Sequence, residues 1–445
     1  MNLHKNLFAI QWNYMRKIYP IFILVFVLLV SFSLNVSKAK AATLYFNYAV
    51  DYNWNEIGNW WNDPDFNSQA SSLPTINDDV IIYNASTVDT NDGPAASVKT
   101  LTTGMFATVG IPVTVANGAT FYGYSSLGSA GVITGGTTFN DSSRNDGEVI
   151  GDAVFNDTDS NGNSGSGTIT GNATFNNSSN NSGTVTKDAI FNDSSMNNGT
   201  VSGITTFHSL SSNYASGTVN GNATFSDSSY NIGAINSNAV FNNYTYNSGP
   251  IIGNVDFKDS SYNMRDITGD VNFYNSSTDN GGMITGNVTF NNESIFLGEI
   301  TGNVTFKDSS SDAGAITGNI KFANASNGTM TFDDQTWQGS FTGVAKDASD
   351  NLITNWIFNH SSNYGTITGN VTFNDDGLGG YRAYNNNVIN GDATFNGGSS
   401  NYTNGTVNGN AIFNNTSFNN GLVAGSAIFN DSSRCNIKIS PVIPL

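Results

Sequence analysis

A repeat of about sixteen residues runs through most of this 445-residue chain and limits what it can fold into. The segments Ile284–Phe290 and Ile300–Phe306 both read Ile-Thr-Gly-Asn-Val-Thr-Phe, and the consensus unit is [IV]-x-G-[ND]-[AV]-x-F-N-[DN]-x-S-x-N-x-G-x. Nine of the sixteen intervals between successive Phe residues of the repeat are 16 residues long. A unit this short cannot bury a core of its own, so the units must stack on one another.

The repeat is marked by the following Phe residues: Phe139, Phe155, Phe175, Phe191, Phe207, Phe225, Phe241, Phe257, Phe273, Phe290, Phe306, Phe322, Phe358, Phe373, Phe395, Phe413 and Phe429.

Each unit carries the pattern of a half-buried strand. Val288 and Phe290 alternate with polar neighbours, which is the period of two that places alternate side chains on one face. Ile284 belongs to a preceding short strand, and Gly286 permits a corner between the two. The Asn, Asp, Ser and Gly residues after each Phe are typical of turns.

The pattern predicts an all-β protein, a single-stack parallel β-solenoid with coils of about 16 residues and a β-rich N-terminal cap. About 18 coils spaced by roughly 4.8 Å would give a rod of about 85 Å. A β-sandwich has strands of varied sequence every 8–12 residues, and a propeller blade needs about 40 residues, so neither fits. We expect three inward columns, formed by Ile or Val, by Ala or Val, and by Phe.

The Ile/Val column contains Val149, Ile169, Val185, Val201, Val219, Ile235, Ile251, Ile267, Ile284, Ile300 and Ile316. The small column contains Ala153, Ala173, Ala189, Ala223, Ala239, Val255, Val271, Val288 and Val304. Because the small column changes from Ala to Val near residue 255, we expect a slight bend or a changed twist there.

The N-terminal segment has the features of an export signal. Basic residues precede an apolar run at 21–34, and Ala39-Lys40-Ala41 supplies small residues at the two positions that a signal peptidase reads. We therefore predict a signal peptide at 1–41 and a secreted or cell-surface protein, with an uncleaved anchor as the alternative. Its single cysteine, Cys435, allows no intramolecular disulfide, and exported proteins poor in cysteine are common in bacteria.

The charge of the mature region excludes some partners. Residues 1–41 hold five basic and no acidic residues, which leaves 11 basic and 34 acidic residues in the remainder, a net charge of −23. Such a body would repel nucleic acid and anionic lipid, so nucleic acid is not expected as a partner. Contact with a membrane is expected only through the signal segment, if it stays uncleaved.

Residues 42–105 do not fit the repeat and form the predicted cap with the first strands, ahead of a solenoid at 106–434 and a C-terminal tail at 435–445. The cap would cover the strand edges and apolar core at the end of the solenoid. The order Trp, Asn-Trp, Pro-x-x-x-Asp-x-Val-x-Ile resembles the N-terminal cap of bacterial extracellular β-helix proteins, including autotransporter-type passengers and G8-type modules. The matching residues are Trp54, Asn59, Trp60, Pro74, Asp78 or Asp79, Val80 and Ile82. The resemblance implies an exported rod of the adhesin-like kind and identifies no ligand.

An irregular coil at 326–357 interrupts the repeat. This segment contains the aromatic residues Trp337, Phe341 and Trp356. One interpretation is that they form a platform for a ligand, since exposed aromatic rings stack on sugars. The alternative is an irregular coil with a loop and no ligand.

One turn resembles the start of a calcium loop. Asp157, Asp159, Asn161 and Asn163 alternate with other residues as oxygen ligands do, although Thr168 stands where such a loop has its bidentate Glu. The alternative is an ordinary turn of the repeat, extended by four residues. No cofactor other than this calcium ion is expected.

Catalytic chemistry has little support in the sequence. An Asp/Asn column recurs two residues after Phe, as in Asp141, Asn177, Asp193 and Asp227, so it predicts a turn ladder rather than a singular carboxylate pair. His208 and His360 both follow a core Phe in a turn, and neither has another His or a Cys cluster nearby in sequence. We therefore predict no catalytic residues, no zinc site and no enzyme.

The sequence as a whole favours an exported structural or adhesive surface protein. It would form an elongated acidic rod that binds extracellular glycans or surface proteins without catalysis. Two alternatives stay open: a β-helix enzyme that degrades polysaccharide, and a filament formed by end-to-end self-association.

Overall fold

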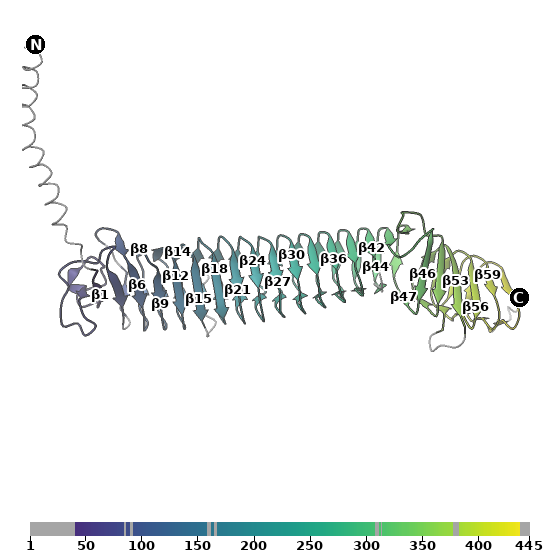
Figure 1. The fold of residues 1–445 in the computed structure, drawn as a ribbon, viewed down its shortest axis with the longest axis horizontal. Helices are drawn as coiled ribbons and strands as arrows, with labels where there is room; N and C mark the ends of the chain where they lie inside the picture. Colours follow the sequence, from purple (N-terminus) through teal and green to yellow (C-terminus); the bar gives the residue numbers. More distant parts are fainter. Residues whose placement is uncertain are drawn as a thin grey trace, which may run out of the picture.

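The chain folds into a rod of stacked β-strands with about 20 turns (Figure 1). The computed structural model describes residues 41–436, apart from 84–85, 90–91, 158–161, 164–166, 308–310, 313 and 377–381. The predicted all-β parallel solenoid is confirmed. In the described part of the chain, the one helical element is the three-residue 3-10 turn η1 (Ile57–Asn59), and no helix there is long and apolar enough to cross a membrane. The predicted signal segment lies outside the described residues, except for Ala41.

A regular coil consists of three short strands, one in each of three sheets. One such coil contains β33 (Val255–Phe257), β34 (Tyr262–Asn263) and β35 (Ile267–Thr268). The next coil opens with β36 (Val271–Phe273), which pairs in parallel with β33 so that each residue lies beside its own copy sixteen positions on. The three sheets of this first stack have 18, 14 and 15 strands, and each strand position therefore generates a column along the rod.

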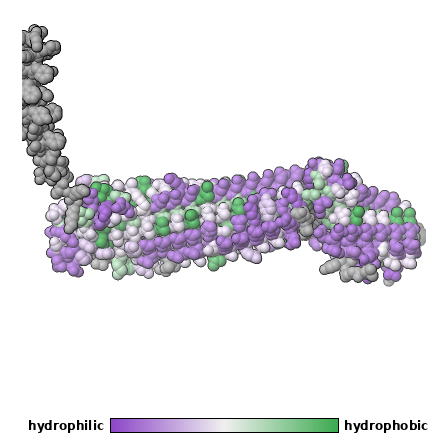
Figure 2. Space-filling view, in the orientation of Figure 1, coloured by the Kyte–Doolittle hydropathy of each residue, from purple (hydrophilic) through white to green (hydrophobic). Residues whose placement is uncertain are grey.

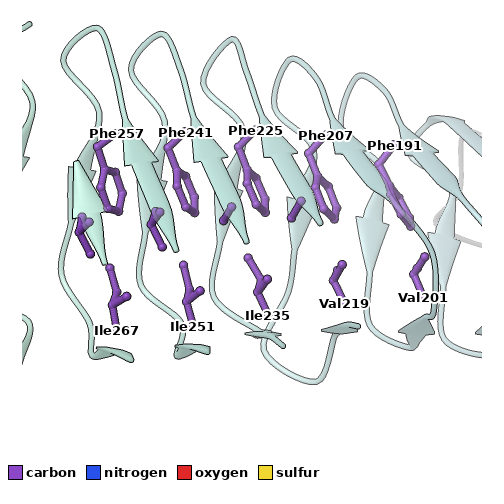
Figure 3. Close-up of a cluster of buried hydrophobic side chains, with 14 of the residues drawn as sticks. Phe191, Val201, Phe207, Val219, Phe225, Ile235, Phe241, Ile251, Phe257 and Ile267 are labelled. Atoms are coloured by element: carbon purple, nitrogen blue, oxygen red, sulfur yellow. The ribbon is translucent and has the colours of Figure 1, made fainter. Parts of the chain in front are cut away.

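The predicted apolar columns are confirmed as the interior of the rod (Figure 3). Phe rings of successive coils stack face to face from Phe121 to Phe322, with centroids 4.6 to 5.5 Å apart and planes within 20° of parallel. Phe121, one coil before the first Phe that the spacing identified, begins this stack.

The spacing of the Phe stack widens toward the break. Between Phe225 and Phe241, whose strands carry Ala223 and Ala239, the ring centroids are 4.7 Å apart. The separation reaches 5.2 Å at Phe290–Phe306 and 5.5 Å at the next pair. These two pairs lie in the part of the stack where the small column holds Val or Ile and where Phe296 and Trp337 also contact the rings. The bend or twist that we expected near residue 255 itself stays a prediction.

A fourth inward column consists of asparagine and was not predicted. Each side-chain amide donates from Nδ2 to Oδ1 of the Asn in the following coil, at 2.7–2.8 Å, and all members are essentially inaccessible to solvent. We call it the amide ladder, and its members in the first stack are Asn145, Asn163, Asn181, Asn197, Asn213, Asn231, Asn247 and Asn263. The ladder satisfies the polar atoms that lie among the Phe, Ile and Val side chains.

The Asp/Asn column after Phe lies in the outer turn, as predicted. Asp227, Asn243, Asp259 and Asn275 have φ between 47° and 55°, a left-handed conformation that Asp and Asn tolerate better than most residues. Asn275 Nδ2 donates to Asp259 Oδ1 at 2.9 Å, so neighbouring turns are also joined through their side chains.

The N-terminal strands extend the first sheet. β1 (Thr43–Phe46) pairs in parallel with β3 (Asp79–Ile82), and β2 (Trp60–Trp61) pairs antiparallel with β1. Trp60 is buried against Phe46 and Trp54, with ring centroids 5.1 and 4.8 Å away. Stacked coils thus begin at β3, inside the range 42–105, and the capping role of this range stays a prediction.

The repeat breaks once, and a second stack follows. The first stack ends with β48 (Ser340–Phe341) and β49 (Ala345–Lys346), whereas β46 (Thr329–Asp333) and β47 (Thr336–Trp337) already begin two sheets of the second. β50 (Asn355–Asn359) and β53 (Asn370–Asp375) continue it. Figure 1 shows the second stack offset from the first at this break.

The interior amides should contribute more to stability than the amides on the surface. We expect Asn213→Ala to lower the free energy of unfolding by about 2–4 kcal/mol, because it removes an acceptor from Asn197 and a donor from Asn231 in a buried position. Denaturant unfolding followed by circular dichroism measures this. Asn236→Ala is the matched control, since Asn236 donates to Asn220 on the exposed surface and its loss should cost less than about 1 kcal/mol. Equal losses in the two variants would contradict a stabilising interior ladder.

Candidate functional site

Successive coils present nearly the same side chains along most of the rod, so a site that occurs only once is expected where the repeat changes. The visible face is largely hydrophilic, with hydrophobic residues scattered along it (Figure 2). In the described chain the repeat changes at three places considered below: the break at 326–357, the end of the amide ladder in the first stack, and the turns around His360.

The predicted aromatic platform at the break was wrong, because the rings fill the interior. Trp337 is 2% exposed and Trp356 is 0% exposed, while Phe341 is half-buried. Trp337 stands in the column of the amide ladder beside Asn363, and Phe341 follows Ile316 in the Ile/Val column. Trp356 stands in the small column beside Val371.

These large rings fill the cross-section where the two stacks are offset. Phe322, the last ring of the first Phe stack, meets Phe332 and Trp356 edge-on, at 86° and 89°. Face-to-face stacking resumes between Phe332 and Phe358, whose centroids are 4.8 Å apart. The aromatic residues at the break therefore act as core, and they leave no ring face for a sugar except part of Phe341.

A buried carboxylate organises the loop of the break. Asp347 accepts hydrogen bonds from the backbone amides of Gly328, Ser349 and Asn351 and from the Asn351 side chain, at 2.8–3.0 Å. These donors, led by Gly328, lower the pKa of Asp347 to about 2. The carboxylate thus stays ionised and ties the loop to the first turn of the second stack.

The predicted calcium ligands are not all in one turn. Asp157 ends β15 (Ala153–Asp157), and Asp159 and Asn161 lie outside the described residues. Asn163 is a member of the amide ladder, where its Oδ1 accepts from Asn145 and its Nδ2 donates to Asn181. The assignment of Asn163 as a ligand was therefore wrong, because its side chain faces the interior; a calcium role for the other three stays a prediction.

The amide ladder of the first stack ends on an aspartate. Asn263 Nδ2 donates to Asp279 Oδ1 at 2.8 Å, and the next residue of the column, Phe296, offers no polar atom. Oδ2 of Asp279 is buried and makes no hydrogen bond within the described chain. Burial raises the pKa of Asp279 to about 7, and hydrogen bonds from Asn263 and Gly282 oppose this only in part.

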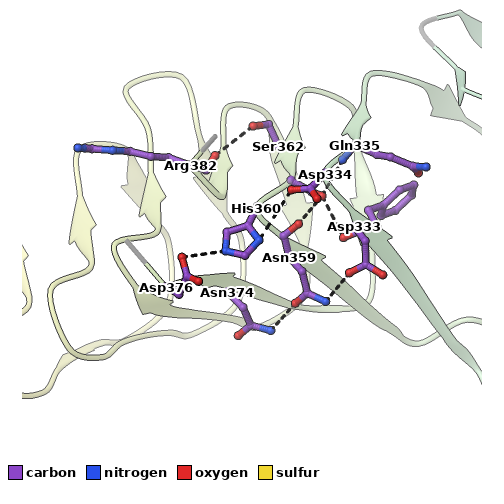
Figure 4. Close-up of polar contacts among 11 residues, drawn as sticks. Asp333, Asp334, Gln335, Asn359, His360, Ser362, Asn374, Asp376 and Arg382 are labelled. Carbon is purple, nitrogen blue, oxygen red and sulfur yellow. Dashed lines mark hydrogen bonds and ion pairs between the residues drawn. The ribbon is translucent and has the colours of Figure 1, made fainter. Parts of the chain in front are cut away.

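Three potential metal ligands converge at His360, in the first coils of the second stack (Figure 4). The Nε2 atom of His360 is 3.1 Å from Asp376 Oδ1, and its Nδ1 is 3.8 Å from Asp334 Oδ1. One ligand atom each from His360, Asp375 and Asp376 lies within 4.8 Å of the other two. A cavity of about 270 Å³ opens here, lined by Asn359, His360, Asn374, Asp375, Asp376 and Asn396.

The convergence at His360 was not predicted, because the carboxylates around this imidazole, from Asp334 to Asp376, are spread over more than forty residues of sequence. The signal lay in the register: Asp334, His360 and Asp375 each stand two residues after a column Phe, so successive coils place them in one row. A metal site at His360 needs no second His or Cys as a ligand, since the neighbouring coils supply carboxylates.

Comparisons of the chain with protein-family models, with curated proteins and with solved structures found no match. The resemblance to capped extracellular β-helix proteins therefore stays a prediction from sequence.

The buried Asp279 should make stability depend on pH. Its pKa in the folded state lies above the ordinary value of 3.8, so the folded state binds the proton more tightly. The resulting stabilisation is complete below about pH 4 and is lost as pH rises through about 7. We expect the melting temperature to fall between pH 5 and pH 8.5, and Asp279→Asn to reduce that fall. Thermal melts followed by circular dichroism measure it.

The matched control is Asp193→Asn, which changes an exposed turn carboxylate of the same stack. It should leave the pH dependence as in the unmodified chain. If Asp279→Asn melts with the same pH dependence as the control, the titrating group lies elsewhere.

Proposed function

We propose that the chain is an exported structural rod that holds its ends apart and offers its polar surface to extracellular glycans or surface proteins, without catalysis. The observation that carries this proposal is the in-register stacking of one coil over about 20 turns. Such a stack lengthens by one strand spacing per coil and adds the same surface each time.

The composition of the surface supports an extracellular role. Residues 42–445 carry a net charge of −23, and the turns present rows of Asn, Asp, Ser and Thr. Amide and hydroxyl groups can donate to and accept from sugar hydroxyls, and the negative charge keeps rods apart in solution. Export rests on the sequence of residues 1–41, and a fusion of this segment to a reporter tests it.

An enzyme is the weaker alternative. Glycoside hydrolysis needs one pair of carboxyl groups at a fixed separation around the scissile bond. Along the regular coils, Asp or Asn holds the left-handed position of the outer turn in most coils, and Ser209 holds it in one. At the break, Trp337 and Trp356, which could have held a sugar beside such a pair, are buried.

If the rod is a modular spacer, removing whole coils should shorten it without unfolding it. Deletion of residues 223–254 removes two coils and joins Asn222 to Val255, which restores the Gly-Asn-Val order of the repeat. We expect a folded protein shorter by about 10 Å in small-angle X-ray scattering. Deletion of residues 223–246 is the control, because it joins Asn222 to Asn247 and shifts every inward column, so it should fold poorly. Equal behaviour of the two deletions would contradict the modular rod.

The functional proposal itself is tested by incubating residues 42–445 with insoluble polysaccharides and with a glycan array. Retention on a glycan without release of reducing sugar supports a binding rod. Release of reducing sugar, abolished by Asp375→Asn, would overturn it in favour of an enzyme.

A further inference from the structure

The turns around His360 depart from the repeat in composition as well as in charge. Two residues after the column Phe, successive coils of the second stack carry Asp334, His360, Asp375 and Gly397. Asp334 and His360 have φ of 52° and 47°, so His360 takes the left-handed turn position that Asp or Asn holds elsewhere. Because the coils stack in parallel, the imidazole lies between carboxylates of the coils on either side (Figure 4).

The charge balance of this cluster favours a cation. Asp375 is only 5% exposed, and two further carboxylates, Asp334 and Asp376, lie within 4 Å of the same imidazole. Even a protonated His360 would leave the four groups with a net negative charge. Asp375 is nearly buried beside two exposed carboxylates, and a divalent ion would compensate the charge of all three.

Two glycines of the next coil lie against Asp375. Gly397 and Gly398 stand two and three residues after Phe395, and of the coils marked by the repeat Phe this is the one in which both positions are Gly. A Cβ atom on Gly397 would lie 1.5 Å from the Asp375 carbonyl oxygen, and one on Gly398 would lie 3.2 Å from Asp375 Oδ2. A side chain at Gly398 would therefore crowd the Asp375 carboxylate. The cavity beside this carboxylate is lined by His360, Asp375 and Asp376 among others and measures about 270 Å³.

The donor set indicates which ions fit. Ca²⁺ and Mg²⁺ prefer ligand sets made wholly of oxygen, whereas an imidazole nitrogen with carboxylate oxygens suits Zn²⁺ and similar transition-metal ions. Bonds of about 2.1 Å place tetrahedral ligand atoms about 3.4 Å apart. The ligand atoms here lie within 4.8 Å of one another, so small rotations of the exposed Asp376 side chain and of its neighbours would bring them to that distance.

We propose that His360, Asp375 and Asp376 form a binding site for Zn²⁺ or a divalent ion of similar chemistry. His360 directly follows β50, Asp375 is the last residue of β53 and Asp376 directly follows it, so the ion would join two successive coils beside the break. Three protein ligands leave the fourth position of a tetrahedral zinc ion for water or for a group from outside the rod.

The test uses the full mature chain, residues 42–445, dialysed against chelator and titrated with Zn²⁺ by calorimetry. We expect one ion per chain, and a higher melting temperature in its presence, since an ion that binds the folded state stabilises it. Co²⁺, added in place of Zn²⁺, should give visible absorption bands that report its coordination.

Three variants locate the site. His360→Asn and Asp376→Asn should weaken binding beyond the roughly 10- to 100-fold that lost supporting residues cost, because each removes a direct ligand. His208→Asn is the matched control, since His208 also follows a core Phe but is hydrogen-bonded to Ser226 in the first stack. Asp376 is exposed, so Asp376→Asn should fold normally and gives a second answer if His360→Asn does not.

The proposal is supported if Zn²⁺ binding is lost in His360→Asn and Asp376→Asn and kept in His208→Asn. It is overturned if the chain binds no Zn²⁺, if both site variants still bind it, if the control loses it equally, or if Ca²⁺ binds the same residues more tightly. None of these results depends on whether the rod binds glycans, so the two proposals can fail separately.

Discussion

Parallel pairing in strict register is the constraint on which the rest of the structure depends. Each strand lies beside its copy in the next coil, so every residue type forms a row along the rod. A row of identical residues is favourable only where neighbouring identical side chains attract one another or at least do not repel. Phe rings stack, aliphatic side chains pack, and amides donate and accept in turn, whereas rows of Asp would repel. This selects the few residue types that the repeat uses, and it accounts for a composition with so little charge.

The same constraint explains how the rod tolerates change. A longer turn can leave the columns intact: the interval from Phe207 to Phe225 is 18 residues, yet Val219 still pairs with Val201. A large ring inside a column contacts its neighbours, as Phe296 does with Phe290 and Trp337 with Phe322. At the break, three columns take Trp337, Phe341 and Trp356 at once, and the stack resumes only after these rings have filled the offset.

The fold could be predicted from sequence because the repeat itself records the register. The Phe, Ile/Val and small columns follow from alternation alone, and Phe191, Val201 and Ala189 lie where the spacing placed them. The amide ladder could not be predicted in this way, since Asn two residues before Gly is also typical of a turn, and only the pairing of the 14-stranded sheet places this Asn inside. Trp337 and Trp356 were predicted to be exposed because the segment that contains them departs from the repeat, so their positions in the coil could not be assigned from the spacing. The residues around His360 were missed because proximity in sequence, rather than position in the coil, was used to look for ligands.

The uniform direction of the amide ladder has an electrostatic consequence. Every side-chain amide from Asn145 to Asn263 points its N–H toward the C-terminal coil, so their dipoles add as peptide dipoles do along a helix. The positive end of this row falls on Asp279, where a carboxylate is better placed than at any other rung. The second stack repeats the same polarity from Asn363 to Asn419, which gives the rod two rows of amide dipoles of the same direction, separated by positions of this column that include Phe296 and Trp337.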